Sequence, residues 1–208
     1  MKKTIVVMSA LIIGCATVKA QKTSFGIKAG AQQNNLTMRY ESDGDWQRNN
    51  ITGAGFHVGG LADISLADHI SVQPAVLFNS KGSVYSSDAK IKMLAIDIPV
   101  NFLYKTGGFF LGLGPNLSYG ISAKTTGEGE AQDWYKKYPV GEGDEEKSML
   151  KRFEIGANLT MGYQFKNNIL ISTNYTQGVG NISNIEESGP GKIRTRQVGI
   201  SIGYMFGK

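Results

Sequence analysis

The longest unbroken alternation of apolar and polar residues, from Phe153 to Phe165, is the feature that most constrains the fold. Its odd-numbered positions carry Phe, Ile, Ala, Leu, Met, Tyr and Phe, and its even-numbered positions carry Glu, Gly, Asn, Thr, Gly and Gln. Period two predicts a β-strand with one apolar face. Strands of soluble proteins have about five or six residues, whereas a tilted strand that crosses a bilayer needs about ten. This segment is therefore long enough to cross a membrane.

The same template recurs along the chain and predicts eight strands. They are Ser24–Tyr40, Gly53–Ser65, Ile70–Lys81, Lys90–Tyr104, Phe109–Ser122, Lys151–Phe165, Ile169–Gly178 and Lys192–Phe206. Single-chain outer-membrane barrels have an even number of strands. Helical periodicity is absent after residue 20, and the 27 glycines suit strands that curve and pack closely. We predict an all-β fold, an eight-stranded antiparallel up-and-down transmembrane β-barrel.

The connections between the predicted strands alternate in length. Three are tight, at residues 66–69, 105–108 and 166–168. Four are long, at residues 41–52, 82–89, 123–150 and 179–191. Outer-membrane barrels have short periplasmic turns and longer exterior loops. We therefore expect the short turns and both ends of the barrel on the periplasmic side.

The N-terminus has the pattern of a secretory signal peptide over residues 1–20. Lys2 and Lys3 precede an apolar stretch, and Val18-Lys19-Ala20 offers small residues for cleavage between Ala20 and Gln21. A mature domain over residues 21–208 follows, with no linker that would divide it. In the alternative, Ile12-Ile13-Gly14-Cys15 is a lipobox and Cys15 is lipidated. After cleavage at Ala20 the chain has no cysteine, and its formal charge falls from +5 to +2, so nucleic acid is not an expected partner.

The face opposite the apolar one is small, polar and partly charged. It comprises Gly26, Lys28, Gly30, Gln32, His57, Gly59, Asp63, Gln73, Asp97, Asn101, Gly112, Gly114, Asn116, Glu154, Asn158, Ser172, Asn174, Gln197 and Ser201. A soluble lipocalin-like barrel alternates equally well, but it turns its apolar face inward around a ligand.

Aromatic residues favour the membrane barrel, because Tyr and Phe gather at both edges of a membrane's apolar band. The periplasmic edge would carry Phe25, Tyr104, Phe109, Tyr163, Phe165, Tyr204 and Phe206, and the exterior edge Tyr40, Phe56, Phe78, Tyr119, Phe153 and Tyr175.

Several short motifs, in order, resemble the porin-family or PorT-like outer-membrane β-barrel proteins of Gram-negative bacteria. They are Phe25-Gly26-Ile27-Lys28-Ala29-Gly30, Gly55-Phe56-His57-Val58-Gly59, Val72-Gln73-Pro74, Ser80-Lys81-Gly82 at a loop, Asp97-Ile98-Pro99-Val100 and Leu113-Gly114-Pro115. The segment from Val198 to Phe206 resembles the C-terminal signal read by the barrel assembly machinery, but it ends two residues before the last residue. The resemblance implies an outer-membrane location and carries no catalytic motif.

The inward charges are the candidate site residues. Lys28, Asp63, Asp97 and Glu154 must be paired or hydrated inside a barrel, and we expect them to form a lumenal polar network together with His57. His57 could act as a general base only with a serine or paired acids within reach, and no motif supplies them. His69 is expected in a short solvated turn beside Asp68. The sequence predicts no catalytic residue, no cofactor and no metal site.

The exterior end carries two further groups of residues. The loop over residues 123–150 is long and charged, and it could be a mobile solvated loop or a surface for a partner or a divalent cation. Basic residues at the exterior strand ends could neutralise lipopolysaccharide phosphates; these are Lys151, Arg152, Lys192, Arg194 and Arg196.

We expect a monomeric, non-enzymatic integral outer-membrane protein with a membrane-structural or loop-mediated interaction role. The alternatives are a narrow pore for small solutes, a barrel enzyme that acts on lipid or peptide, and an assembly factor for secretion.

Overall fold

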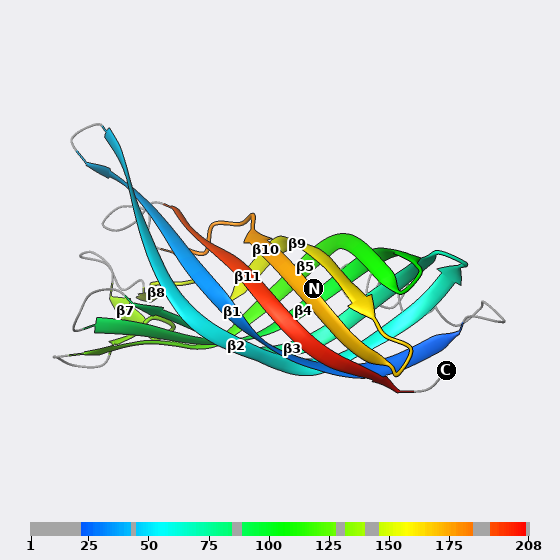
Figure 1. The fold of residues 1–208 in the computed structure, drawn as a ribbon. Helices are drawn as coiled ribbons and strands as arrows, with labels where there is room; N and C mark the ends of the chain where they lie inside the picture. The colour runs from blue at the N-terminus through cyan, green and yellow to red at the C-terminus, as the bar shows by residue number, and fades with distance from the viewer. Residues whose placement is uncertain are drawn as a thin grey trace, which may run out of the picture.

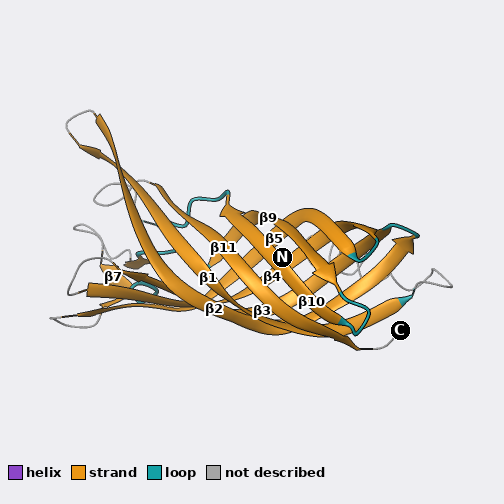
Figure 2. Ribbon diagram, in the orientation of Figure 1, coloured by secondary structure: helices purple, strands orange, loops and turns teal. Residues whose placement is uncertain are grey.

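A computed structural model describes residues 22–42, 45–84, 89–127, 132–139, 146–184 and 192–206. The predicted signal peptide, its cleavage site at Ala20 and Gln21, and Cys15 lie outside these residues. Strands make up nearly all of the described chain, and short turns join them (Figure 2). No helix in the described ranges is long and apolar enough to cross a membrane.

Eight long strands and three short ones are present (Figure 1). The long strands are β1 (Thr23–Ser42), β2 (Asp45–Ala67), β3 (Ile70–Val84), β4 (Ala89–Thr106), β5 (Phe109–Gly127), β9 (Phe153–Gln164), β10 (Ile169–Gly178) and β11 (Lys192–Phe206). The short strands β6 (Gln132–Asp133), β7 (Lys137–Pro139) and β8 (Glu146–Ser148) lie in the predicted 123–150 loop.

The eight long strands form a closed antiparallel ring. Consecutive long strands pair side by side, and β11 returns to pair with β1 over a register that runs from Phe25 opposite Phe206 to Arg39 opposite Lys192. The β4–β5 pairing completes the circle. The ring therefore has no free edge among its long strands. Closure matters because backbone N–H and C=O groups at a free edge would find no hydrogen-bond partner in lipid. The predicted eight-stranded barrel is confirmed.

Strands extend into two of the predicted long loops. β1 and β2 stay paired to Ser42 opposite Asp45, so most of the predicted 41–52 loop is a ribbon that projects past the barrel at the long-loop end (Figure 1). Similarly, β3 and β4 pair as far as Val84 opposite Lys90. At the base of the β1–β2 ribbon the side chains of Leu36 and Ile51 are still buried, whereas the β2 residues from Gln47 to Asn50 are exposed.

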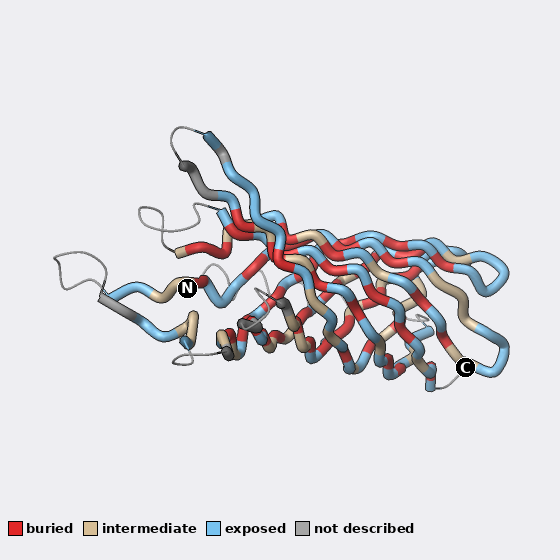
Figure 3. The backbone as a smooth tube through the Cα atoms, turned by 60° about the vertical axis from the view of Figure 1, so that its left-hand side comes forward, coloured by how far each residue is buried: buried red, intermediate tan, exposed pale blue. Residues whose placement is uncertain are grey.

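The side chains alternate between an exposed apolar face and a buried one, as the strands in Figure 3 show. On β11 the outward residues Ile202, Ile200 and Val198 are 61%, 62% and 49% exposed. Exposed aromatic rings lie at both edges of the band; they are Phe25, Tyr104, Phe109, Phe165, Tyr204 and Phe206 at the short-turn end and Phe56, Phe78, Tyr119, Phe153 and Tyr175 at the other. Apolar residues thus face outward, as a lipid-exposed barrel requires and a lipocalin-like one does not.

The inward face is not polar throughout, which corrects the sequence-based description. One buried apolar cluster, near the short turns, comprises Leu61, Ala75, Leu77, Leu103, Phe110, Leu170 and Met205. A second, at the long-loop end, comprises Leu36, Met38, Ile51, Ile91, Met93, Ala123, Leu150, Ile182 and Ile193. We call these the inner apolar layer and the outer apolar layer. Most of the buried polar residues lie between them.

Candidate functional site: the closed lumen and its exterior rim

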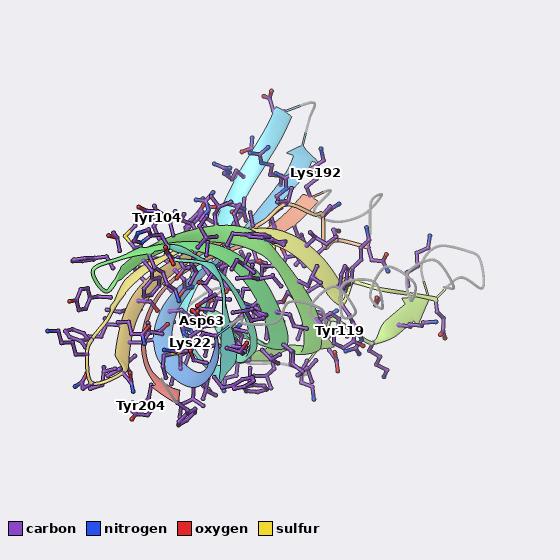
Figure 4. The ribbon with its side chains drawn as sticks, turned by 90° about the vertical axis from the view of Figure 1, so that its right-hand side faces the viewer. Lys22, Asp63, Tyr104, Tyr119, Lys192 and Tyr204 are labelled. Atoms are coloured by element: carbon purple, nitrogen blue, oxygen red, sulfur yellow. The ribbon has the colours of Figure 1, made fainter. Side chains whose placement is uncertain are left out.

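The predicted site residues Lys28, His57, Asp63, Asp97 and Glu154 are all buried in the barrel. Figure 4, which looks along the barrel from the short-turn end, labels Asp63 within the ring and Tyr104 and Tyr204 outside it. Alternation places these five residues inward because each shares a phase with buried neighbours on its strand. Hydrogen bonds within the described chain divide them among separate clusters and do not join them into one network.

His57 lies at the centre of a hydrogen-bonded cluster in the lumen. Its Nδ1 lies 2.9 Å from Oε1 of Gln32, and its Nε2 lies 2.7 Å from Oγ of Ser201. Gln32 in turn donates to Oδ1 of Asn34 at 3.0 Å. The ring can approach the wall because Gly30, on the neighbouring strand, has no side chain. A serine therefore lies within hydrogen-bond reach of His57, which no sequence motif indicated because the two residues are 144 positions apart.

Asp97 forms a buried ion pair with Lys81, whose Nζ lies 3.3 Å from Oδ1 of Asp97. Asn79 donates to Oδ2 at 2.6 Å, and the hydroxyl of Ser118 donates to Oδ1. Lys81 also donates to Oγ of Ser118 at 3.1 Å. The sequence placed Lys81 at the last position of a predicted strand, beside a loop, and missed this role, although Lys81 has the same phase as the buried Asn79 on β3.

Asp63 lies apart, at the short-turn mouth, beyond the inner apolar layer. It pairs with Nζ of Lys105 and accepts a hydrogen bond from Nε2 of Gln73 at 3.1 Å. Lys105 was missed because it was assigned to a turn, whereas it belongs to β4. His69 is exposed in the adjacent turn, with its Nδ1 2.8 Å from the Lys105 carbonyl oxygen. This cluster ties the β2–β3 turn to β4.

Glu154 lies at the other end, next to the outer apolar layer. Thr195 holds it through its hydroxyl, at 2.8 Å from Oε2, and through its backbone N–H, at 3.3 Å from Oε1. For Lys28, no described carboxylate lies within ion-pair distance. Lys28, His57 and Asp97 line a cavity of about 20 Å³, which is the space of about one water molecule. The described polar centre between the two apolar layers thus leaves little room for water beside Lys28, His57 and Asp97.

The described part of the segment that follows β5 packs against the outer apolar layer at the exterior end. Trp134 donates its backbone N–H to Ala123 at 2.8 Å and its indole N–H to Thr125 at 2.7 Å. Trp134 and Tyr135 pack against the outer apolar layer. The expectation of a solvated loop is therefore wrong for this part of the segment, because its aromatic residues cover apolar side chains.

Arg152 fastens this segment to the barrel wall. Its guanidinium lies 4.4 Å from the centroid of the Tyr135 ring and donates to the carbonyl oxygens of Gly120 and Ile121, each at 3.0 Å. Arg152 was predicted to face lipopolysaccharide phosphates together with Lys151, Lys192, Arg194 and Arg196. The structure instead commits its guanidinium to contacts within the protein.

The ligand chemistry of the described residues is limited. No group of three or more His, Cys, Asp or Glu side chains in the described ranges could hold a metal ion. Many of the lumenal polar groups bind one another, and the larger hollows lie at the short-turn end, on the outer wall over β1–β4 and at the exterior rim. A ligand from outside therefore has more room on the outer surface and at the two ends of the barrel than in the lumen.

A closed ring of eight strands, an outward apolar band and a filled lumen define a small integral membrane β-barrel. The model of the outer membrane protein beta-barrel domain matches residues 19–184, and the chain belongs to this family. It is accordingly an integral protein of the cell outer membrane. The matched region ends before β11, the strand that closes the ring.

No curated protein matches this chain. Among solved structures, the Neisserial surface protein A has 15% identity and a TM-score of 0.50, and the alignment covers 89% of this chain and 99% of that one. Ail of Yersinia pestis, solved with the heparin analogue sucrose octasulfate, has 12% identity, a TM-score of 0.49 and coverage of 89% and 99%. OprG from Pseudomonas aeruginosa has 14% identity, a TM-score of 0.43 and coverage of 90% and 98%. At such identity, the likeness to the Neisserial protein concerns the fold alone.

Proposed function

We propose that this protein is a non-enzymatic, membrane-structural barrel that presents its exterior segments to the surroundings and does not conduct solutes. The observation that carries the proposal is the lumen: two apolar layers cover a polar centre whose cavity is about 20 Å³. An ion path needs continuous hydration, and apolar constrictions exclude water. The proposal includes a monomeric state and insertion by the barrel assembly machinery through the β11 segment.

Conductance tests the closed lumen directly. The full-length protein, purified and folded into planar bilayers, should give no steady current steps, whereas an outer-membrane porin in the same lipid should give them. Swelling of proteoliposomes in a small sugar should likewise match that of protein-free vesicles. Reproducible current steps from the unmodified protein would establish the alternative, a narrow pore.

A second candidate function rests on the contact between Ser201 and His57. A serine hydroxyl that is hydrogen-bonded to an imidazole is the arrangement that nucleophilic hydrolases use. Two observations weigh against catalysis here: Gln32 occupies the position of the orienting carboxylate, and the cavity beside His57 has room for about one water molecule. We therefore assign the pair to packing of the lumen.

A fluorophosphonate probe, which labels activated serines, distinguishes the two roles. The folded protein in detergent should label no more than its Ser201→Ala variant. Stoichiometric labelling that disappears in both Ser201→Ala and His57→Gln would instead identify a hydrolase. The PorT-like assignment and a role as an assembly factor for secretion stay predictions from the sequence resemblance.

A further inference from the structure

Arginine and lysine side chains form a row across three neighbouring strands at the long-loop end. Arg39 of β1 stands directly opposite Arg48 of β2 on one side and Lys192 of β11 on the other. Arg194 and Arg196 follow on the same face of β11, and all five side chains are exposed. Like charges opposite one another in a sheet destabilise it, so this arrangement needs a compensating partner.

The described chain does not supply that compensation for the arginines. No described carboxylate is paired with Arg39, Arg48 or Arg194. Arg196 donates its Nε to Oε1 of Gln177 at 3.0 Å, which uses one of its five N–H donors. The basic pair Lys92 and Lys124 on the opposite wall differs, because Asp133 stands opposite Lys124 in the β5–β6 ladder.

The arginines also surround a hollow. Thr37, Gln177, Gly178 and Val179 join the five basic residues around a cavity of about 190 Å³. This is room for several water molecules, which is enough for a phosphate group. The hollow therefore offers guanidinium groups from three strands to one anion.

The height of the hollow on the barrel indicates where that anion comes from. Val198 is the last outward apolar residue of β11, and Arg196, Arg194 and Lys192 follow it on the same face. With a rise of about 3.3 Å per residue and a strand tilt of roughly 40°, they lie ~5 to ~15 Å above the apolar band. Arg196 therefore lies in the headgroup region, which reaches ~5 to ~8 Å beyond the hydrocarbon core, and Arg194 and Lys192 lie above it, at a level that only a larger headgroup reaches. Figure 4 shows Lys192 beside the base of the projecting β1–β2 ribbon.

We infer that Arg39, Arg48, Arg194 and Arg196 form a binding site for the phosphate groups of an outer-leaflet glycolipid. Guanidinium groups bind phosphate oxygens in pairs of parallel hydrogen bonds, which an ammonium cannot do. The site gives the barrel a fixed lipid contact on its β11–β1–β2 side. It is independent of the proposed closed lumen, because it lies on the outer surface.

The test uses the full-length protein in detergent and titrates it with lipid A that carries both phosphates, followed by native mass spectrometry. The variant Arg39→Gln/Arg194→Gln should bind this lipid about tenfold more weakly than the unmodified protein, because two charge-assisted contacts are lost. The matched control Lys92→Gln/Lys124→Gln removes the same charge from the opposite wall and should stay within about twofold. A heat-dependent gel shift in both variants would verify their folding.

Three outcomes would overturn the inference. If both double variants bound lipid A equally weakly, the loss would come from the lower net charge and not from the arginine site. If lipid A without its phosphates bound as tightly as lipid A with both, phosphate would not be the group that the site recognises. Inorganic phosphate that binds as tightly as lipid A would identify a free anion and not a lipid as the ligand.

Discussion

Gly30 is the residue on which the central histidine cluster depends most directly. A Cβ atom there would come within 2.7 Å of Cε1 and Nε2 of His57 and closer still to the Ile200 carbonyl oxygen. Gly60, on the neighbouring strand, is a matched contrast, because its Cβ would meet only the Gly26 carbonyl oxygen, at 3.8 Å.

We expect Gly30→Ala to lower the free energy of unfolding by about 1–3 kcal/mol, because the added methyl group displaces the His57 ring. Gly60→Ala should change it by less than about 0.5 kcal/mol. Reversible urea unfolding in lipid vesicles, followed by tryptophan fluorescence, measures both. Equal stability of the two variants would contradict the close packing of His57 on this strand.

The ion pair between Lys81 and Asp97 makes a second prediction at the same scale. Asp97→Asn leaves a buried ammonium without its counter-charge, which costs about 3–5 kcal/mol. Lys81→Met/Asp97→Asn removes both charges, and we expect it to recover much of the loss. The same urea titration measures the order of the three proteins. A double variant less stable than Asp97→Asn alone would show that the pair is not the source of the effect.

Among the elements, the segment over β6 and the following turn acts as the outer cover of the lumen. Burial raises the pKa of Tyr135 to about 12, and the positive charge of Arg152 lowers that pKa by a smaller amount. A raised tyrosine pKa means that the folded state favours the neutral phenol. Its contribution to stability is therefore complete below the unfolded pKa of about 10 and is lost as the pH rises from there to about 12.

We expect the cover to become sensitive to an alkali-tolerant protease between pH 10 and about 12 in the unmodified protein. Tyr135→Phe should lack this pH step, because it has no phenol to ionise. At neutral pH, Arg152→Ala should be cleaved faster than the matched surface variant Lys151→Ala. Identical cleavage of these two variants would indicate that the contacts of Arg152 do not hold the cover.

The whole molecule depends on β11 to close the ring. The family match ends at residue 184, yet among the described strands it is β11, over residues 192–206, that joins β1 to β10. A chain truncated after residue 184 would expose two unpaired strand edges, which lipid does not tolerate.

We therefore expect the full chain to fractionate with the outer membrane and to change its gel mobility on boiling, as a closed barrel does. The truncated chain should show neither behaviour. A truncated chain that still shows the mobility shift would mean that seven strands can close without β11.

The sequence predicted much of the fold because period-two alternation is a local property of the chain. The bounds of β10 and β11 agree with the alternation at both ends. The same alternation predicted which way the five candidate site residues point, and all five are buried in the barrel: Lys28, His57, Asp63, Asp97 and Glu154. The extension of β1 and β2 was missed because their outward residues beyond the apolar band are polar, among them Asn, Arg and Thr. The alternation of apolar and polar residues that identifies a strand is therefore lost there.

The sequence by itself determined the all-β class, the number of long strands and the inward phase of the predicted polar residues, because each depends on alternation and local turn signals. Only the tertiary structure decided which inward residues meet. Closing the ring brings Ser201 to His57, separates Asp63 from Asp97 by an apolar layer, and turns Arg152 onto Tyr135. It also aligns Arg39 with Arg48 and Lys192, since strand register joins residues far apart in the chain. Contacts of that kind depend on register and closure, which no local pattern encodes.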